Sequence, residues 1–282
     1  MNSTASGDSH TQAEDGGLKR AGSGRSYSAP AAACAAEVLL LLARERELSL
    51  ADAARKLERS KTLTFRVMRE LEERELVQRT DSGRFRLGIS ALEVGGAYAT
   101  HAAYVNTARD VLRRLADITG ETSNLGVLRG ADVMCLINQE GHNVIGTFWG
   151  AGDRLPAHCT AIGKALLAEL PPDERRELLG PNLTTLTPQS IATHKELNQA
   201  LATVREQGYA TTHGDAIYGL NAIAVTVGLP GRGGEPAAIS ISMSEDKFRT
   251  REQEFLAYLI EGRDRIQRET AGLNNLASRD GG

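Results

Sequence analysis

The stretch Leu48–Gly88, LSLADAARKLERSKTLTFRVMRELEERELVQRTDSGRFRLG, decides the fold of the N-terminal part of the chain. Its apolar residues recur at helical spacing and predict two short helices, Leu50–Leu57 and a second one that runs from Ser60 to about Arg74. Two alternating segments follow and predict a hairpin that turns at Asp81–Gly83. Helix, turn, helix and hairpin in this order predict a winged helix-turn-helix, a structure whose second helix enters a groove of DNA.

Serine residues are expected to begin both helices. Ser49 stands three residues before Asp52, in the manner of a capping box, and Ser60 can cap the second helix. The second helix should then bury one side and expose the other. The side expected to be buried carries Val67, Met68 and Leu71, and the exposed side carries Arg66, Arg69 and Glu73.

Basic residues are concentrated where the second helix begins. Arg55–Arg69 contains six Lys or Arg residues against Glu58 alone, a local charge of +5 in a chain of net charge −3. Residues 31–98 hold 12 basic and 11 acidic side chains, a difference of +1, whereas residues 99–282 hold 18 and 22, a difference of −4. Because phosphate binding needs a local basic surface, the acidic total does not argue against DNA binding.

The side chains expected to contact DNA lie on the second helix, at its caps and on the hairpin. Arg66 is the candidate for a bidentate contact with guanine, whereas Lys61, Thr62 and the amides of the helix N-terminus would hold a phosphate. Arg84 and Arg86 would reach the DNA backbone or a minor groove. The full set of candidate contacts is Ser49, Ser60, Lys61, Thr62, Leu63, Phe65, Arg66, Arg69, Arg84 and Arg86.

Four regions are expected along the chain. Residues 1–30 are rich in Ser, Gly and Asp and predict a disordered tail. Residues 31–90 form the winged helix-turn-helix, and residues 91–105 form a linker helix in which Gly95-Gly96 is a candidate soft point. Residues 106–275 mix strands with helices and predict one α+β domain.

The patterns outside the opening stretch predict the following elements. The first helix is expected over Ala31–Glu45, with Leu39, Leu42 and Ala43 on its apolar stripe and Ala35, Val38 and Leu41 close beside it. Asn106–Thr119 is expected to bury Val111, Leu112, Leu115 and Ile118. Strands are expected at Ser123–Leu128, Val133–Asn138, Val144–Phe148, Tyr209–Thr212, Asn221–Gly228 and Ala237–Ser242, with a loop at Gly231–Gly234. Further helices are expected at Thr160–Leu170, from there to Leu179, at Lys195–Gln207 and at Thr250–Gln267.

Other classes of function find little support. The three cysteines and six histidines show no metal-ligand spacing, so we expect neither a metal nor another cofactor. No apolar run approaches the roughly 20 residues of a membrane helix, and unpaired thiols fit a cytoplasmic location. We expect no catalytic residues, because the adjacent side chains of His158 and Cys159 should diverge and Gly163-Lys164 lacks the flanking residues of a phosphate loop.

The stretch Leu48–Gly88 also resembles the N-terminal domain of IclR-type transcriptional regulators. That family begins its second helix with Lys-Ser-Thr-x-x-Arg and carries a Gly-Arg-Tyr/Phe-x-Leu-Gly wing. Lys61-Thr62 and Arg66 match the helix start, and Gly83–Gly88 (GRFRLG) matches the wing.

The second half of the chain resembles the same family independently. Leu155–Ala168 (LPAHCTAIGKALLA) is similar to its Ala-x-Gly-Lys-Ala-Leu-Leu segment, and Val204–Ala210 (VREQGYA) is similar to its Arg-x-x-Gly-Tyr motif. Gly219–Ala224 and Ala238–Ser242 are similar to the two strands that follow. These motifs stand in the family's order, and the resemblance covers about residues 32–270.

The resemblance implies a GAF-like effector-binding and oligomerisation domain behind the winged helix-turn-helix. It implies a sequence-specific transcriptional regulator, more often a repressor, that binds double-stranded operator DNA as a homodimer or homotetramer. A small organic effector, often a carboxylate or an aromatic molecule, would control that binding. The matched positions that would contact the effector are Leu155, Ala161, Ile162, Asp215, Ala222, Ser240 and Ser242.

The chemistry of this set is compatible with an anion. Ala161 and Ile162 are expected in the first turn of a helix, whose amides favour negative charge. Ser240 and Ser242 alternate to one face of a strand, so both hydroxyls can reach one cavity, unless they only satisfy each other within the sheet. Trp149 could line the same cavity or pack in the core or an interface.

Two departures from the family pattern leave alternatives open. Leu63 stands where the family usually has a polar residue that faces DNA, and Thr64 stands where it is usually apolar. Either Leu63 or Phe65 contacts a thymine methyl group, or the helix is rotated slightly. The family's acidic stretch after the Gly-Tyr motif has fewer acidic residues here, at Thr211–Asp215.

Two alternative functions remain open. One is a DNA-binding domain fused to a catalytic domain, and the other is a constitutive DNA binder without a ligand.

Overall fold

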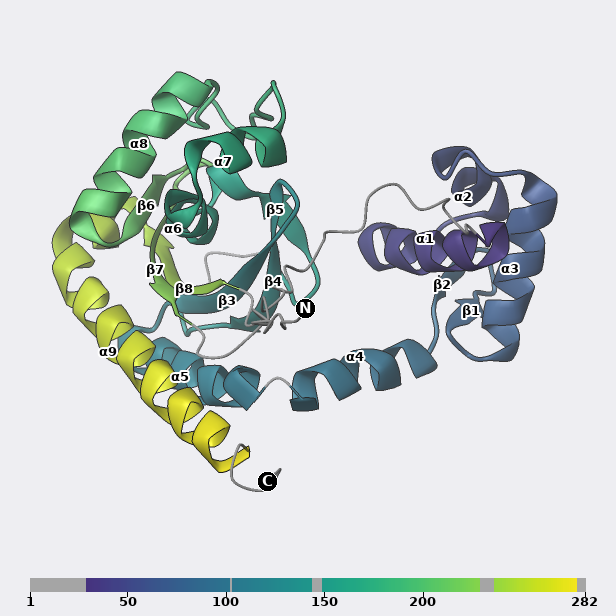
Figure 1. Ribbon diagram of the computed structural model, residues 1–282, viewed down its shortest axis with the longest axis horizontal. Helices are drawn as coiled ribbons and strands as arrows, with labels where there is room; N and C mark the ends of the chain where they lie inside the picture. Colours follow the sequence, from purple (N-terminus) through teal and green to yellow (C-terminus); the bar gives the residue numbers. More distant parts are fainter. Residues whose placement is uncertain (1–28, 102, 144–148, 229–235, 278–282) are drawn as a thin grey trace, which may run out of the picture.

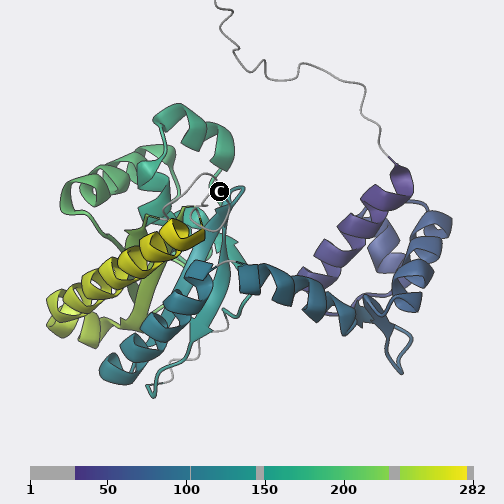
Figure 2. The ribbon, with the colours of Figure 1, turned by 60° about the horizontal axis from the view of Figure 1, so that its bottom comes forward.

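The computed structural model describes residues 29–101, 103–143, 149–228 and 236–277 (Figure 1). It has an N-terminal part made of three helices and a hairpin, a connecting helix, and a C-terminal part built on one sheet (Figures 1 and 2). Apart from residues 29 and 30, the predicted tail lies outside the described residues, and so do the predicted strand Val144–Phe148 and the predicted loop Gly231–Gly234.

The N-terminal elements have the order that the sequence predicts. They are α1 (Pro30–Glu45), α2 (Leu50–Lys56), α3 (Lys61–Glu73), β1 (Val77–Arg79) and β2 (Phe85–Leu87). The buried stripe of α1 differs from the prediction: it consists of Cys34, Val38 and Leu42, whereas Leu39 is half-buried and Ala43 is exposed. The stripe follows a spacing of four residues because this side of α1 packs on α3 and β2.

Both predicted serine caps are confirmed. The Ser49 hydroxyl oxygen accepts a hydrogen bond from the Asp52 amide at 3.1 Å, and the Ser60 hydroxyl oxygen accepts one from the Leu63 amide at 3.3 Å. Each cap satisfies an amide that has no partner inside its helix, which is typically worth ~1 kcal/mol. The two caps therefore fix where α2 and α3 begin.

The hairpin is confirmed and is tied to the chain that precedes α2. Gly83 has φ of 76°, a left-handed conformation that favours glycine, and its amide donates to the Thr80 carbonyl at 2.8 Å. Leu48 and Phe85 exchange two backbone hydrogen bonds, of 3.0 and 2.8 Å. These bonds hold the hairpin beside the helix-turn-helix, as a wing requires.

The linker region forms α4 (Ser90–His101), and α5 (Ala103–Thr119) follows. Gly95 and Gly96 lie within α4 and do not interrupt it. α5 is longer at its N-terminus than predicted; it buries Val111, Leu112 and Leu115 as expected, but Ile118 is exposed. Ile118 lies beside Tyr258 at the outer groove between α5 and α9 (Glu245–Ala277), so it faces away from the sheet.

The C-terminal part is a six-stranded antiparallel sheet with the order β5-β4-β3-β8-β7-β6. Its strands are β3 (Thr122–Arg129), β4 (Asp132–Gln139), β5 (Arg154–Pro156), β6 (Ala210–His213), β7 (Leu220–Val227) and β8 (Ala237–Ser244). β5 was not predicted, because three residues give too little alternation for a strand signal. The final helix α9 begins earlier and ends later than the predicted Thr250–Gln267.

Helices cover both faces of this sheet (Figures 1 and 2). α5 and α9 pack on one face, whereas α6 (Ala161–Glu169) and α8 (His194–Gln207) pack on the other, with α7 (Pro172–Leu179) beyond them. A 3₁₀ turn, η1 (Ala157–Cys159), joins β5 to α6. A mixed α/β domain of this kind leaves a space between the sheet and the N-terminus of α6, where the candidate ligand site lies.

Candidate functional sites: a basic helix face and a sheet cavity

The exposed face of α3 is polar and basic. It lies at the end of the molecule remote from the six-stranded sheet (Figure 1). The predicted DNA contacts that are exposed on it are Lys61, Thr62, Phe65, Arg66 and Arg69. Arg66 forms no ion pair with any described residue, and Arg69 has only a long one, 3.9 Å to Glu73. The guanidinium of Arg66 is therefore available to a partner from outside the chain.

The structure explains how α3 accommodates an apolar Leu63 and a polar Thr64, the reverse of the family pattern at these two positions. Thr64 is fully buried, and its hydroxyl donates to the Ser60 carbonyl at 3.1 Å, so its polarity is satisfied inside the helix. Leu63 is half-buried and packs against the N-terminal core. Leu63 therefore does not share the exposed face of α3 with the other candidate contacts, whereas Phe65 does.

The two capping serines, which are also candidate DNA contacts, form hydrogen bonds within the protein. Ser49 both accepts from the Asp52 amide and donates to the Asp52 carboxylate at 2.7 Å, so its only donor hydrogen is used at the start of α2. Ser60 lies exposed at the first turn of α3, with Lys61 and Thr62 directly after it. The start of α3 thus places free helix amides beside a basic side chain, an arrangement that suits a phosphate.

The two predicted wing arginines have different surroundings. Arg84 is half-buried; it donates to the Glu47 carbonyl at 3.1 Å and lies 3.8 Å from the Glu47 carboxylate. Arg86 is exposed on β2, and its one hydrogen-bond partner among the described residues is the Gln78 side chain, at 3.3 Å. Arg79, which the sequence analysis did not select, is exposed on the opposite strand, with its guanidinium 5.7 Å from the Phe85 ring. Strand alternation places Arg79 on the same face as the buried Val77, so its exposure at the end of β1 does not follow from the sequence pattern.

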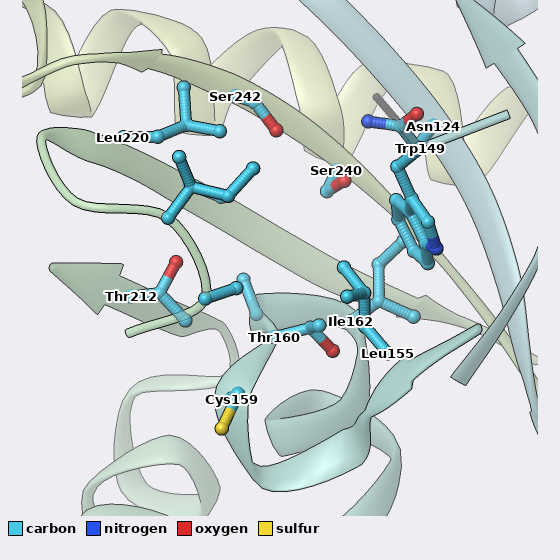
Figure 3. Close-up of a pocket in the computed structure, with 14 residues that line it drawn as sticks. Asn124, Trp149, Leu155, Cys159, Thr160, Ile162, Thr212, Leu220, Ser240 and Ser242 are labelled. Atoms are coloured by element: carbon cyan, nitrogen blue, oxygen red, sulfur yellow. The ribbon is translucent and has the colours of Figure 1, made fainter. Parts of the chain in front are cut away.

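A cavity of about 50 Å³ lies between the sheet and the N-terminus of α6 (Figure 3). Six of the seven predicted ligand residues line it: Leu155, Ala161, Ile162, Ala222, Ser240 and Ser242. Trp149, for which the cavity was one of the expected positions, lines it too, and the lining residues that were not predicted are Asn124, Cys159, Thr160, Thr212, Ala216, Ile217 and Leu220. Figure 3 shows Asn124, Ser240 and Ser242 on the sheet side and Thr160 and Cys159 on the side of α6.

Strand register brings the polar lining residues of the sheet together. Asn124 on β3 pairs with Ser240 on β8, while Ser242 pairs with Ala222 on β7 and Ala222 with Thr212 on β6. The polar groups therefore surround a small alanine side chain, which leaves space above the sheet. Ser240 and Ser242 reach one cavity, as their alternation predicts.

Asn124 is a buried polar side chain that the sequence analysis missed. It is 1% exposed, and its Oδ1 accepts a hydrogen bond from the Asn138 amide group at 2.9 Å. Its Nδ2 has no acceptor among the described residues and faces the cavity (Figure 3). Asparagine is depleted in strands, so an asparagine near the start of the buried strand β3 was the available signal.

The N-terminus of α6 forms the opposite wall. The Thr160 hydroxyl oxygen accepts from the Gly163 amide at 2.9 Å, whereas the amides of Ala161 and Ile162 have no acceptor within the described part of the chain. Gly163 is required by close packing, since a Cβ at this position would lie 2.0 Å from the Ala157 carbonyl oxygen. The backbone of η1 therefore packs directly on the first turn of α6, and this packing holds the two free amides at the cavity wall.

Asp215 is the predicted ligand residue that does not line the cavity. Its carboxylate lies 2.6 Å from the Lys164 ammonium, with Asp215 3% and Lys164 5% exposed, and it also accepts from the His213 amide at 2.7 Å. Lys164 donates in addition to the Thr211 carbonyl at 3.3 Å. This ion pair holds the loop after β6 against α6. Asp215 therefore supports the α6 wall of the cavity from the side that faces away from it.

The prediction that the side chains of His158 and Cys159 diverge is wrong. The turn η1 directs both side chains toward the Thr184 carbonyl oxygen. The His158 Nε2 lies 2.9 Å and the Cys159 Sγ lies 3.5 Å from that oxygen. Burial raises the pKa of the Cys159 thiol and lowers the pKa of the His158 imidazole. A neutral thiol that donates to a carbonyl has no activating base, so the pair is not arranged for nucleophilic catalysis.

Trp149 lines the cavity and also packs against the core beside α6, so both expected positions apply to it. Its side chain is half-buried, and its indole Nε1 is buried without a hydrogen-bond partner among the described residues. Among the described residues there is no group of three or more potential metal ligands. No helix in the described ranges is long and apolar enough to cross a membrane.

Comparison with known proteins identifies relatives of both parts of the chain. Residues 96–268 match the family described as bacterial transcriptional regulator IclR, C-terminal, and residues 31–81 match the IclR helix-turn-helix domain. The chain is 32% identical over 195 residues to the HTH-type transcriptional regulator BhcR of Paracoccus denitrificans, a match that covers 68% of this chain and 70% of that protein. It is 31% identical over 207 residues to the HTH-type transcriptional repressor AllR of Klebsiella pneumoniae, covering 71% and 76%.

A solved structure with the same architecture is an IclR transcriptional regulator from Alicyclobacillus acidocaldarius. The two share 27% sequence identity and superpose with a TM-score of 0.77 over 86% of this chain and 100% of that one. The relatives are transcriptional regulators and not enzymes, in agreement with the prediction of no catalytic activity.

Proposed function

The chain belongs to the IclR family of bacterial transcriptional regulators and is a DNA-binding regulator, and we propose that it binds its operator through α3 and the wing under the control of a small organic ligand in the sheet cavity. One observation carries the proposal: the chain combines an exposed basic helix with a cavity whose wall contains unpaired hydrogen-bond donors. The relative AllR is named a repressor, which favours repression as the outcome of binding.

The proposed operator contacts divide into base reading and phosphate binding. Arg66 reads guanine through two of its guanidinium nitrogens, because it is exposed in the middle of the recognition face and has no ion pair with a described residue. Lys61, Thr62 and the first amides of α3 hold a phosphate. Arg86 on the wing binds the DNA backbone, while Arg84 supports the wing through Glu47.

The proposed effector is small and carries a carboxylate or a comparable acceptor group. The cavity wall offers donors from the Ala161 and Ile162 amides, from Asn124 and from the Trp149 indole, and none of its described lining residues is Lys, Arg or His. Negative charge would therefore be stabilised by the N-terminus of α6, whose dipole favours an anion. The Trp149 ring would cover the apolar part of the effector.

A homodimer or homotetramer is proposed as the form that binds DNA. One winged domain covers a single half-site, which gives limited affinity and specificity. Large apolar side chains are exposed at the start of α4 and on α1: Leu40, Ile89, Leu92 and Val94. Burying them between two copies of the chain would place two α3 helices on one operator.

The test begins with purified full-length chain and a library of DNA duplexes from which it selects its operator. The chain is then heated with a panel of small carboxylates, with and without an aromatic ring, to find those that raise its melting temperature. An effector should raise the melting temperature and change the dissociation constant of the selected operator. If the panel contains ligands that raise the melting temperature but none changes operator binding, ligand control is wrong.

A cavity-filling variant separates the two sites. Ala222→Leu places a larger side chain between Ser242 and Thr212, so it should abolish the thermal shift while operator binding is retained. Ala202→Leu is the matched control, because it makes the same change on the exposed side of α8. An unchanged thermal shift in Ala222→Leu would contradict the assignment of the cavity as the effector site.

A further inference from the structure

Phe65 is an exposed aromatic residue on an otherwise polar helix face. Its side chain is 47% exposed, and it is absent from the N-terminal core that α3 forms with α1 and the wing. Val67, Met68 and Leu71 already anchor α3 to that core. Phe65 is therefore not needed to pack the helix, and its exposed ring is available to a partner outside the chain.

The surroundings of Phe65 determine the kind of partner it fits. Lys61 and Arg69 lie one helical turn away on either side, and Arg66 is its neighbour in sequence. All three are exposed, and an apolar protein surface that covered Phe65 would strip water from these cations without replacing it. A partner that is polyanionic and presents an apolar group between its charges satisfies both requirements.

The major groove of DNA is such a partner. Its phosphates neutralise the flanking cations, and the one methyl group that its base edges expose is the C5-methyl of thymine. We propose that Phe65 packs against a thymine methyl group in the operator, so that this chain reads a T·A pair beside the bases contacted by Arg66. This inference rests on the proposed function, because it requires α3 to enter the major groove.

Among the two residues that the sequence left open for this contact, the structure favours Phe65. Leu63 is half-buried and packs against the N-terminal core, so its side chain is largely used. The burial of Thr64 shows how the helix accommodates the reversed polarity of Leu63 and Thr64 without rotating Phe65 inward. The methyl-reading position is therefore adjacent to Arg66 in the chain.

Replacing thymine by uracil tests the contact, because it removes the methyl group and leaves the Watson–Crick edges intact. The operator selected by the full-length chain is synthesised with thymine throughout and with uracil at one position at a time. The wild-type dissociation constant should rise about fourfold per half-site at one symmetric position, the size expected for one buried methyl group. Phe65→Ala should bind the thymine operator more weakly and no longer distinguish thymine from uracil.

Two further variants serve as comparisons. Phe65→Leu keeps an apolar side chain and should retain part of the preference for thymine. Tyr218→Ala removes an exposed aromatic side chain from the C-terminal part and should leave the preference unchanged. Because Phe65 lies outside the core, the melting temperature of Phe65→Ala should stay close to that of the wild type.

Each contrary result has a separate meaning. Equal wild-type binding to thymine and uracil at every position would overturn the Phe65 contact while the proposed function stands. The same uracil penalty in wild type and Phe65→Ala would also overturn it, since another residue would then read the methyl group. Failure of the wild type to select any duplex would overturn the proposed function and this inference with it.

Discussion

The exposed face of α3 and the cavity beside α6 place their polar side chains in opposite environments. On α3, Lys61 and Arg66 come from one short run of sequence and stand in solvent. In the cavity, Asn124, Thr160 and Ser240 come from distant segments and are nearly fully buried. A solvated side chain can be replaced without harm to the fold, whereas removing the partner of a buried polar group leaves that group unsatisfied and costs stability. Mutations on α3 should therefore change binding, and mutations behind the cavity should change stability.

Two ion pairs, one exposed and one buried, illustrate this difference. Arg69 and Glu73 are exposed and lie 3.9 Å apart, whereas Lys164 and Asp215 are buried and lie 2.6 Å apart. Exposed pairs contribute ~0–1 kcal/mol, because water screens the charges and two flexible side chains must be ordered. Removing one member of a buried pair leaves an uncompensated charge inside the protein.

Lys164→Met should therefore cause the largest loss of stability among the changes considered. It leaves the Asp215 carboxylate buried with only the His213 amide as a partner, and it should lower the free energy of unfolding by ~3–5 kcal/mol. Arg69→Met, the matched control, should lower it by less than ~1 kcal/mol. Urea unfolding followed by circular dichroism measures both values.

The double variant Lys164→Met/Asp215→Leu sharpens the result. Removing both charges should recover part of the stability lost in Lys164→Met, because no unpaired charge is then left in the interior. If the double variant were less stable than Lys164→Met, the loss would come from packing around the Lys164 side chain and not from the buried charge.

Arg66→Ala should have the next largest effect, and it should act on binding alone. The side chain has no ion pair with a described residue, so its loss should leave the melting temperature unchanged. Loss of a bidentate contact with guanine should reduce discrimination between operator and nonspecific DNA by ~1–3 kcal/mol. Fluorescence anisotropy with both kinds of duplex measures the change.

Arg113→Ala provides the control for charge. Arg113 is exposed on α5 and pairs with Asp110 at 3.8 Å, far along the chain from α3. Its removal should leave the specificity ratio as it is in the wild type. Equal losses of specific and nonspecific binding in Arg66→Ala would assign Arg66 to a phosphate instead of a base.

The same contrast explains what the sequence could predict. The caps at Ser49 and Ser60 and the turn at Gly83 depend on neighbours within a few residues, and each was predicted correctly. The exposure of Arg66 follows from helical periodicity in the same way. Local rules therefore suffice for a binding surface that one helix presents to solvent.

The cavity depends on register and on distant partners, which a single sequence does not specify. A bulge between Leu125 and Gly126 shifts the pairing of β3 with β4, and the pairing of β3 with β8 sets Asn124 beside Ser240. Asp215 was assigned to the ligand set because it matches a position of the family pattern, and its actual partner, Lys164, stands 51 residues earlier in the chain. Nothing in the spacing of the two residues indicates that they meet.

The smallest expected effect concerns α4, which connects the two kinds of site. Gly95 and Gly96 lie within this helix, and a Cβ at either position would meet no atom within 4 Å among the described residues. Gly95→Ala/Gly96→Ala should therefore fit without a clash and stabilise the helix by ~0.5–1 kcal/mol per residue.

Operator affinity without ligand should change little, whereas the change that the effector causes should become smaller, because a stiffer α4 resists the bending that we expect to carry the signal. Ala97→Gly, which softens the same helix, should not reduce the effector response. An unchanged effector response in the double alanine variant, measured by operator titration with and without ligand, would show that the signal does not depend on bending at these glycines.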